Sequence, residues 1–392
     1  MTTINILVIG GVGKINWKQL FEHAEINQRP IRIERAHWDE IVLVSYHDSG
    51  LILDLYPKPG SHNETTSTAV IGYIPHFIIF RSAGRGIYGQ DFRNILYGIM
   101  HANLPCLNSA QSIYLCQEKP ILYGKLTEIQ RRMGSAMFPL IGQTYYASWR
   151  GMSFHAELPL VVKFGTCHSG FGKMRISNDS DFEDLRSIAA LQAHYVTAEP
   201  FIDWDFDIRI QKIGHHYRAF RRTSSNWKGK GASQQDEDIE VNERYKRWID
   251  EASEVLGMDV CAIDAVHSKV DDREYILELN DSAIGFNMRH QEEDLQHLKE
   301  LIMLRLVQLF DGEKKQKDDQ REENIVIGKE SQVNNNLSEK KPLDEFDQLP
   351  LEEQVIILKN RIAQLEKEKE EAVLMVEPKS SNIFSNLFKR NN

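Results

Sequence analysis

Short apolar runs separated by polar turns dominate the first part of the chain. The runs "INILVIG", "IVLVSYH" and "FIIFRSA" begin at residues 4, 41 and 77, and amphipathic stretches lie between them. Continuous apolar runs joined by helices are typical of parallel strands that are buried on both faces of a sheet. The pattern therefore predicts a small open α/β domain over about residues 1–110, in which these three runs are buried parallel strands.

Residues 111–310 combine longer helical patterns with further strands. Helical spacing is seen in "EKPILYGKLTEIQRRMG", "DFEDLRSIAALQ" and "NERYKRWIDEASEVLG". Strands are predicted in "DFDIRIQKIG", "HYRAFRRTS", "VCAIDAVHS" and "YILELN", where apolar residues recur with a period of two or fill the run. The sequence therefore predicts a second α/β domain over residues 111–310, richer in strands after residue 198.

The pattern changes after Phe310. Residues 311–350 are rich in charged and amide side chains and have few large apolar ones, which predicts a disordered linker. Residues 351–376 carry apolar residues at heptad spacing, so either a coiled coil or a single solvated helix is expected there. The tail at 377–392, with "NIFSNLFKR", would be a frayed end or a weak membrane or partner contact.

Composition narrows the class of protein. The chain has 392 residues and a formal net charge of −10, which argues against a nucleic-acid binder because such proteins carry an excess of Lys and Arg. Its apolar runs fall short of the ~20 residues that a membrane span requires. The N-terminal "MTTINILVIGG" resembles a first strand rather than a signal peptide. Its four cysteines lack metal-binding spacing, so we expect reduced thiols in the cytosol.

Two glycine-rich loops are candidates for phosphate binding. The first, "ILVIGGVGKIN", lacks the third glycine of a dinucleotide-binding fingerprint, because Asn16 occupies that place. It also fails as a Walker loop, since Lys14 is followed by Ile15 rather than by Ser or Thr. The sequence therefore favours a tight strand-to-loop turn over a phosphate site here.

The second loop lies in "VVKFGTCHSGFGKMRI" and has stronger features. Lys163 ends an apolar strand, which would fix its ammonium group beside the loop. Gly165, Gly170 and Gly172 would let backbone amides approach a polyanion, and Lys173 adds a second positive charge. An ordinary glycine-rich hairpin with lysines remains the alternative.

Groups suited to a nucleotide follow further along the chain. In "TAEPFIDWDFDIRI", the backbone at Glu199 could pair with an adenine edge, while Phe201 and Ile202 would cover the base. Asp207, on the next strand, could accept hydrogen bonds from ribose hydroxyls. A surface carboxylate is the alternative for Glu199, and a strand-end cap for Asp207.

A basic, glycine- and serine-rich loop comes next, in "RAFRRTSSNWKGKGAS". Arg221 and Arg222 end the preceding strand, and Asn226 and Lys228 lie on the loop, which could close over phosphates. A solvated basic hairpin is the alternative.

Three oxygen-bearing side chains suggest a divalent metal. "VCAIDAV" places Asp264 in an apolar strand, and "YILELND" places Glu278 and Asn280 on one face of another strand. A carboxylate in such a strand is costly unless it is paired or bound to metal, and oxygen ligands suit Mg²⁺ or Ca²⁺. A buried salt bridge with Arg209 is the alternative.

The order of these parts resembles the ATP-grasp fold. A lysine strand, a glycine loop, E-P-F-I, a D-I-R strand, a basic loop and an acidic strand with E-x-N follow one another. More narrowly, "KFGTCHSGFGK", "TAEPFID", "DIRIQKIG", "NWK" and "RYKRWIDEASEVLGMDVCAIDAVH" resemble the ATP-binding core of the synapsins, over roughly residues 4–310. The resemblance implies an ATP-grasp core preceded by a pre-ATP-grasp α/β domain.

The resemblance also implies roles for individual residues. The adenine would be bound by Glu199, Phe201 and Ile202, and the metal by Asp264 and Glu278. Lys228 would lie on the closing loop. The phosphates would be held by Lys119, Lys163, His168, Ser169, Gly170, Gly172 and Lys173.

Synapsins are peripheral proteins of synaptic vesicles, and the resemblance implies the same setting here. The family binds ATP with a divalent ion, so ATP with Mg²⁺ or Ca²⁺ is expected. It oligomerises through this core, which implies a homodimer or tetramer, and it associates with phospholipid and actin. The implied function is regulation of vesicle clustering or neurotransmitter release, in the cytoplasm or on vesicle membranes.

The sequence departs from typical synapsins in three ways. The N-terminal phosphorylated region is expected to be absent, and the Pro-rich C-terminal region is replaced by the charged linker and heptads. Asn280 completes an E-x-N motif that resembles those of active ATP-grasp ligases. An alternative is therefore a carboxylate–amine ligase of the glutamate-ligase type, with Arg209 and Arg222 holding an acyl phosphate. Whether ATP is turned over stays open.

Overall fold

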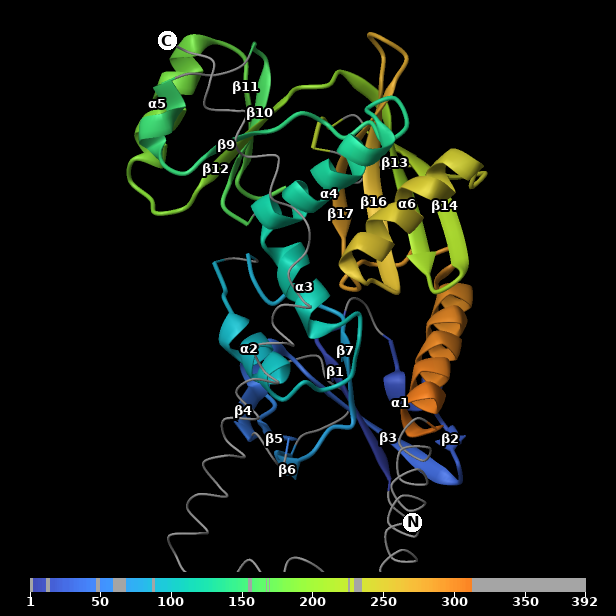
Figure 1. Ribbon diagram of the computed structural model, residues 1–392. Helices are drawn as coiled ribbons and strands as arrows, with labels where there is room; N and C mark the ends of the chain where they lie inside the picture. Colours follow the sequence, from blue (N-terminus) through green and yellow to red (C-terminus); the bar gives the residue numbers. More distant parts are fainter. Residues whose placement is uncertain are drawn as a thin grey trace, which may run out of the picture. The chain divides into compact units, whose positions relative to one another are not determined.

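The first of two compact units carries all the structural detail. The units are Met1–Gly312 and Glu313–Asn392. The sequence predicts a linker at 311–350, but residue 311 is the last described residue of a helix, and residues 312–350 lie outside the described residues. The expected helix at 351–376 and the tail at 377–392 also lie outside them. The computed structural model, drawn in Figure 1, describes residues 3–11, 15–46, 50–58, 68–86, 89–153, 157–166, 168, 170–224, 226–228 and 235–311.

A five-stranded, mostly parallel sheet forms the centre of the N-terminal region (Figure 1). Its strands are β1 (Ile4–Ile9), β2 (Glu25–Ile26), β3 (Arg29–Ala36), β7 (Phe77–Phe80) and β8 (Cys106–Leu107). The apolar β1 lies between β3 and β7 and is parallel to both, which confirms the predicted open α/β domain. The helices of this region are α1 (Trp17–Leu20), the 3₁₀ helix η1 (Trp38–Glu40) and α2 (Arg93–His101).

The described part of the run that begins at residue 41, residues 41–46, does not belong to that sheet, so its expected place as a buried parallel strand is wrong. A separate antiparallel sheet consists of β4 (Ile41–Tyr46), β5 (Gly50–Leu55) and β6 (Val70–Tyr73). Val42 and Val44 of β4 are 53% and 48% exposed, so the strand alternates between core and solvent although its sequence is continuously apolar. On this side of β1 the parallel neighbour is instead β3. Its sequence contains charged residues, so the apolar pattern did not identify it as a buried strand.

A four-stranded antiparallel sheet forms one side of the second region. In spatial order its strands are β11 (Lys173–Ile176), β10 (Leu160–Phe164), β12 (Val196–Pro200) and β9 (Thr144–Tyr146). The helices α5 (Asp179–Ala189) and η2 (Trp149–Ser153) share a buried cluster with these strands. This sheet contains the second glycine loop, between β10 and β11.

A five-stranded antiparallel sheet forms the other side. In spatial order its strands are β15 (Gln235–Ile239), β14 (His216–Thr223), β13 (Trp204–Ile213), β16 (Val260–Ser268) and β17 (Glu274–Asn280). The helices α3 (Ala110–Gln117), α4 (Lys119–Met133) and α6 (Glu243–Leu256) contribute to one core with these strands. Asn242 caps the start of α6 and Gly257, at φ +64°, ends it, as expected for these residue types.

A last helix, at residues 291–311, returns to the N-terminal sheet. Leu298, Ile302 and Leu306 of this helix share one buried cluster with Ile4 and Val8 of β1. The N-terminal sheet is therefore covered by the last part of the described chain.

Within the described residues, no helix combines the length and apolarity that crossing a bilayer would require.

Candidate functional site

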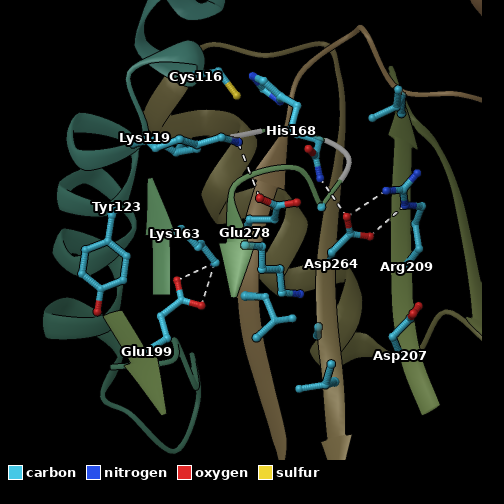
Figure 2. Close-up of a pocket in the computed structure, with 18 of the residues that line it drawn as sticks. Cys116, Lys119, Tyr123, Lys163, His168, Glu199, Asp207, Arg209, Asp264 and Glu278 are labelled. Atoms are coloured by element: carbon cyan, nitrogen blue, oxygen red, sulfur yellow. Dashed lines mark hydrogen bonds and ion pairs between the residues drawn. The ribbon is translucent and has the colours of Figure 1, made fainter. Parts of the chain in front are cut away.

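A cavity of about 510 Å³ collects most of the candidate residues, from β10, β12, β13, β14, β16, β17 and the start of α4 (Figure 2). The segment after β17 and residues 82 and 83 of the N-terminal region complete its lining. The candidates that line it are Lys119, Lys163, Gly165, His168, Gly170, Lys173, Glu199, Asp207, Arg209, Arg222, Lys228, Asp264, Glu278 and Asn280.

Lys163 and Glu199 face each other across two adjacent strands. Lys163 Nζ lies 2.7 Å from Glu199 Oε1, and Gln143 Nε2 donates to the same oxygen at 2.8 Å. The side chain of Glu199 is only 4% exposed, so the surface-carboxylate alternative is wrong. A buried carboxylate needs such partners because leaving it unpaired is costly. Lys163 is thereby held at the cavity wall, as its position at the end of β10 predicts.

Lys119 reaches the same cavity from the first turn of α4. Its Nζ lies 3.6 Å from Glu278 Oε2, as Figure 2 shows. Partial withdrawal from water inside the cavity, together with the nearby Asp264, would raise the pKa of Glu278, but the positive charges of Lys119 and Lys163 outweigh this and the pKa is lowered. Glu278 is therefore a carboxylate at neutral pH, facing two lysines that come from separate elements.

Asp264 is held by three donors. Arg209 donates to both of its oxygens at 2.8 Å, Arg222 Nη2 lies 3.2 Å from Oδ1, and Asn280 Nδ2 donates to Oδ2 at 2.9 Å. Four donated bonds use the four lone-pair positions of a carboxylate. Burial would raise the pKa of Asp264, but Arg209 and Arg222 outweigh it and lower the pKa to about 2. The expected alternative of a salt bridge with Arg209 is therefore present.

The pKa of Asp207, the second carboxyl group of this network, is shifted in the opposite direction to that of Asp264. Asp207 is also buried, and Arg222 donates to it. Burial raises the pKa of Asp207 to about 6, although the nearby Arg222 opposes the rise. Asp207 is therefore a buried residue of β13 that pairs with Arg222 and lines the cavity.

An irregularity in β17 aligns Glu278 with Asp264. Asp264 is opposite Glu278, but the next residue, Ala265, is opposite Ile276, so Leu277 is an extra residue. Such bulges re-aim side chains in a strand. Glu278 and Asn280 line the same cavity as Asp264, so the three oxygen-bearing candidates do come together on adjacent strands.

These residues differ in how well they fit a divalent metal. The Glu278 side chain is 39% exposed and meets the cavity, so its oxygens can accept a cation there. Asn280 directs its amide nitrogen to Asp264, which leaves its carbonyl oxygen as a donor for a metal. Asp264 fits only if at least one of its present donors moves away.

The second glycine loop is a hairpin that also lines the cavity. Gly165, Gly170 and Gly172 have φ of +54°, +80° and +66°, a region that favours glycine. A Cβ atom added at Gly170 would lie 3.9 Å from Lys228, so the loop is close to the basic loop after β14. Ser169 lies outside the described residues, and Gly172 is not among the residues that line the cavity.

Phe201 and Ile202 are not among the residues that line the cavity. The guanidinium of Arg175 lies 3.8 Å from the Phe201 ring centroid, and the rings of Phe201 and Trp227 meet at 65° with their centroids 6.1 Å apart. Trp227 does line the cavity, with the ammonium groups of Lys173 and Lys228 over its ring at 5.2 and 5.5 Å.

Sequence reasoning missed several residues of the cavity. Trp227 stood between two candidates in "SNWKG" and is the aromatic surface that the two lysines share. Asp281 follows Asn280 directly, is buried, and has a pKa raised by that burial. Gln143 had no pattern that could identify it, since only its contact with Glu199 places it here.

The described part of the first glycine loop is tightly packed at Gly10. Gly10 has φ +79°, its N–H donates to Ala36 O at 2.7 Å, and an added Cβ would lie 1.8 Å from Ser82 Oγ. Its amide is therefore already used, which favours the expected tight turn. Residues 12–14 lie outside the described residues.

Three comparisons with known proteins identify the family. The family model described as "Synapsin pre-ATP-grasp domain" matches residues 2–106, and "Synapsin, ATP binding domain" matches residues 108–308. A relative named Synapsin, from Drosophila melanogaster, is 36% identical over 299 residues, which cover 74% of this chain and 28% of that protein. The chain thus spans just over a quarter of that relative's length.

Solved structures of ligases are similar in fold. The ATP-grasp ligase PsnB, complexed with a phosphomimetic variant of minimal precursor, Mg and ADP, is 16% identical, with a TM-score of 0.53 over 78% of this chain and 99% of the ligase. VanG D-Ala:D-Ser ligase from Enterococcus faecalis is 14% identical, with a TM-score of 0.52 over 78% of this chain and 100% of the ligase. Such likeness shows the ATP-grasp fold alone.

Because the two family models match in succession almost all of the region described here, the chain belongs to the synapsin family and carries its ATP-binding domain.

Proposed function

We propose that the chain acts as a synapsin-like peripheral protein of vesicle membranes, which binds ATP in the cavity and regulates vesicle clustering or neurotransmitter release. Family membership and the relative named Synapsin support this function. Because the chain spans 28% of that relative, its activity and partners are part of the proposal.

The observation that carries the ATP site is the meeting of two lysines with carboxylates in one cavity. Lys119 and Lys163 come from separate elements and contact Glu278 and Glu199, within 3.6 and 2.7 Å. In the proposed complex, ATP phosphates attract these ammonium groups and the amides of the loop at Gly170. Lys173 and Lys228, which flank Trp227, would add charge at the open side.

A divalent ion would be held by Glu278 and Asn280, with Asp264 as a third ligand once its arginines are drawn to phosphate. The ion would neutralise phosphate charge, as hard oxygen-bound cations do. We propose Mg²⁺, which the related ligase PsnB holds with ADP. Ca²⁺ is compared with Mg²⁺ in the calorimetric titrations described next.

Isothermal titration calorimetry with ATP tests the site. Lys163→Ala should weaken binding at least about tenfold, because a charge-assisted contact to phosphate contributes roughly 1.5–3 kcal/mol. Lys125→Ala is the matched control, since this lysine on α4 pairs with Glu128 and does not line the cavity. Titrations in Mg²⁺, in Ca²⁺ and without metal identify the ion. Equal affinity for both variants, with folding checked by circular dichroism, would remove Lys163 from the site.

A carboxylate–amine ligase is the second candidate, favoured by Arg209 and Arg222 at the cavity wall beside Asn280. In such a reaction a substrate carboxylate takes the γ-phosphate, ADP leaves, and an amine displaces phosphate from the acyl phosphate. The two arginines would hold the acyl phosphate. ADP release that depends on an added carboxylate and amine would favour the ligase, and tight ATP binding without such release would favour the regulator.

The partners expected of a synapsin-like protein need tests of their own. Sedimentation with and without ATP would show whether a homodimer or tetramer forms. Flotation with phospholipid vesicles and co-sedimentation with actin filaments would test the two proposed partners. Deleting residues 351–392 should reduce self-association if the heptads pair, and unchanged sedimentation would exclude that role.

A further inference from the structure

Two histidines meet away from the cavity, where the hairpin of β13 and β14 contacts the helix at residues 291–311 (Figure 1). His216 begins β14, and His297 and Glu300 lie three residues apart on the helix. None of the three lines the ATP cavity. We propose that this histidine cluster, His216, His297 and Glu300, is a binding site for a transition-metal dication of the Zn²⁺ type.

The donor atoms are of the kind that zinc binds, and they lie close to the spacing of a zinc site. Imidazole nitrogens and carboxylate oxygens are its usual ligands. One such atom from each of the three residues lies within 4.8 Å of the other two. Atoms bound to one tetrahedral zinc at about 2.0–2.1 Å lie roughly 3.4 Å apart, so the donor atoms must approach one another by up to about 1.4 Å on binding. His216 and Glu300 are exposed side chains that can rotate to do so.

His297 has two nitrogens in different surroundings. Its Nδ1 is buried and lacks a hydrogen-bond partner among the described residues, and Glu300 Oε2 lies 3.7 Å from it. Its Nε2 lies 3.7 Å from Glu293, which Arg218 holds at 2.8 Å. A metal-binding imidazole usually presents one nitrogen to the metal and the other to a carboxylate. The Nδ1 atom is therefore the ligand, and Glu293 orients the ring.

The backbones that carry the ligands are fixed against each other. Asp294 on the helix is buried and accepts from Gln211 at 2.8 Å and from Arg218 at 3.0 Å, both on the hairpin. Gly214, in the turn before His216, has φ +59°, and an added Cβ would lie 3.3 Å from Leu301. Only side-chain rotation is then needed on binding, which keeps the cost of ordering the site low.

In the structure the two imidazole rings stack, with centroids 3.5 Å apart and planes at 13°. Stacked rings point their lone pairs side by side rather than at one point. Rotation of the exposed His216 ring out of the stack makes the lone pairs converge on an ion beside Glu300. A bound metal would then tie the β13–β14 hairpin to the last described helix.

Calorimetry with Zn²⁺ on the metal-free full chain, in excess Mg²⁺ to occupy oxygen-ligand sites, tests the proposal. We expect one Zn²⁺ per chain, with affinity at least about tenfold weaker in His216→Gln and in His297→Gln. His23→Gln is the matched control, because His23 is 92% exposed beside Glu22 and belongs to no such cluster within the part of the chain that the structure describes. Equal Zn²⁺ affinity in all four proteins, or no binding to the wild type, would overturn the site.

Two further readouts separate metal binding from a change in folding. Co²⁺ should give the visible absorption of a tetrahedral site in the wild type and in His23→Gln, and lose it in His216→Gln. Zn²⁺ should raise the melting temperature of the wild type, because it binds the folded state alone, and leave that of His216→Gln unchanged. An equal rise in His216→Gln would contradict the assignment.

Discussion

The side-chain amide of Asn108 forms hydrogen bonds with both backbone polar groups of Val260, as the backbone of a neighbouring strand would. Its side-chain Nδ2 donates to Val260 O at 2.7 Å, and its Oδ1 accepts from Val260 N at 2.9 Å. The same Oδ1 accepts from Asp259 N at 2.9 Å. Val260 begins β16, the strand that carries Asp264, so one amide side chain joins the end of the N-terminal sheet to a strand of the cavity.

Asn108→Ala should lower the free energy of unfolding by at least about 2 kcal/mol, because it leaves three backbone groups without their partner. Asn108 has φ +37°, so alanine also adds backbone strain. Asn103→Ala is the matched control, since exposed Asn103 has φ +48°. Urea denaturation measures both variants, and equal losses would mean that strain alone explains the effect.

Gly10→Ala should destabilise the fold by more than about 1–2 kcal/mol, the usual cost of a positive φ, because the new Cβ would also overlap Ser82. Gly124→Ala, within α4, should instead be neutral or stabilise by roughly 0.5–1 kcal/mol, since nothing lies within 4 Å of an added Cβ. Thermal melts compare the two. ATP affinity should be kept in folded Gly10→Ala protein, and its loss would reopen a phosphate role for the first loop.

Replacing one partner of the Asp264–Arg209 ion pair should lower the free energy of unfolding more than replacing both partners together. Arg209→Met leaves a buried carboxylate with fewer donors, and we expect a loss of about 3–5 kcal/mol. The double change Arg209→Met with Asp264→Asn should lose less than the sum of the single changes. Lys125→Ala, which removes the exposed pair with Glu128, should cost no more than about 0.5 kcal/mol. Additive losses at Asp264 and Arg209 would show that the pair is uncoupled.

The stability of the fold should depend on Asp207 in mildly acidic solution. Burial raises its pKa to about 6, so the folded state keeps a proton that the unfolded state loses near pH 4. The stability that this proton contributes is present below about pH 4 and is lost as pH rises to about 6. Asp264, with a pKa of about 2, does not titrate in this window.

Relative to Asp207→Asn, the wild type should therefore lose up to roughly 1.4 kcal/mol of unfolding free energy per pH unit between about pH 4 and 6. Asp203→Asn is the control, because the Asp203 side chain is 63% exposed. Urea midpoints across this range measure the difference. A constant difference between wild type and Asp207→Asn would contradict the raised pKa.

Sequence patterns predicted strands well where one periodicity dominated. β13, β14, β16 and β17 follow the predicted runs, and α4 and α6 follow helical spacing with clear ends. The pattern failed at β3 and β4 because tertiary context decides which strands are covered on both faces. β3 is parallel to β1 although it carries Arg and Glu, and β4 is half exposed although it reads "IVLV".

The candidate site was predictable where chemistry depends on residue type within one strand. Glu278 and Asn280 share a face by their spacing, and Lys163 follows from its strand end. The partners of these residues were not readable, because Lys163–Glu199 and Asp264–Arg222 join strands far apart in sequence. Trp227 and Gln143 also line the cavity, but no sequence pattern places them there, because only the tertiary fold brings them to it.

The last helix has a consequence for synthesis of the chain. Leu298, Ile302 and Leu306 cover the same cluster as Ile4 and Val8, so one side of the first sheet stays open until the ribosome has released almost the whole described region. We expect the nascent N-terminal region to need a chaperone, or to remain loosely packed, during that interval. Truncation before residue 291 would make this exposure permanent.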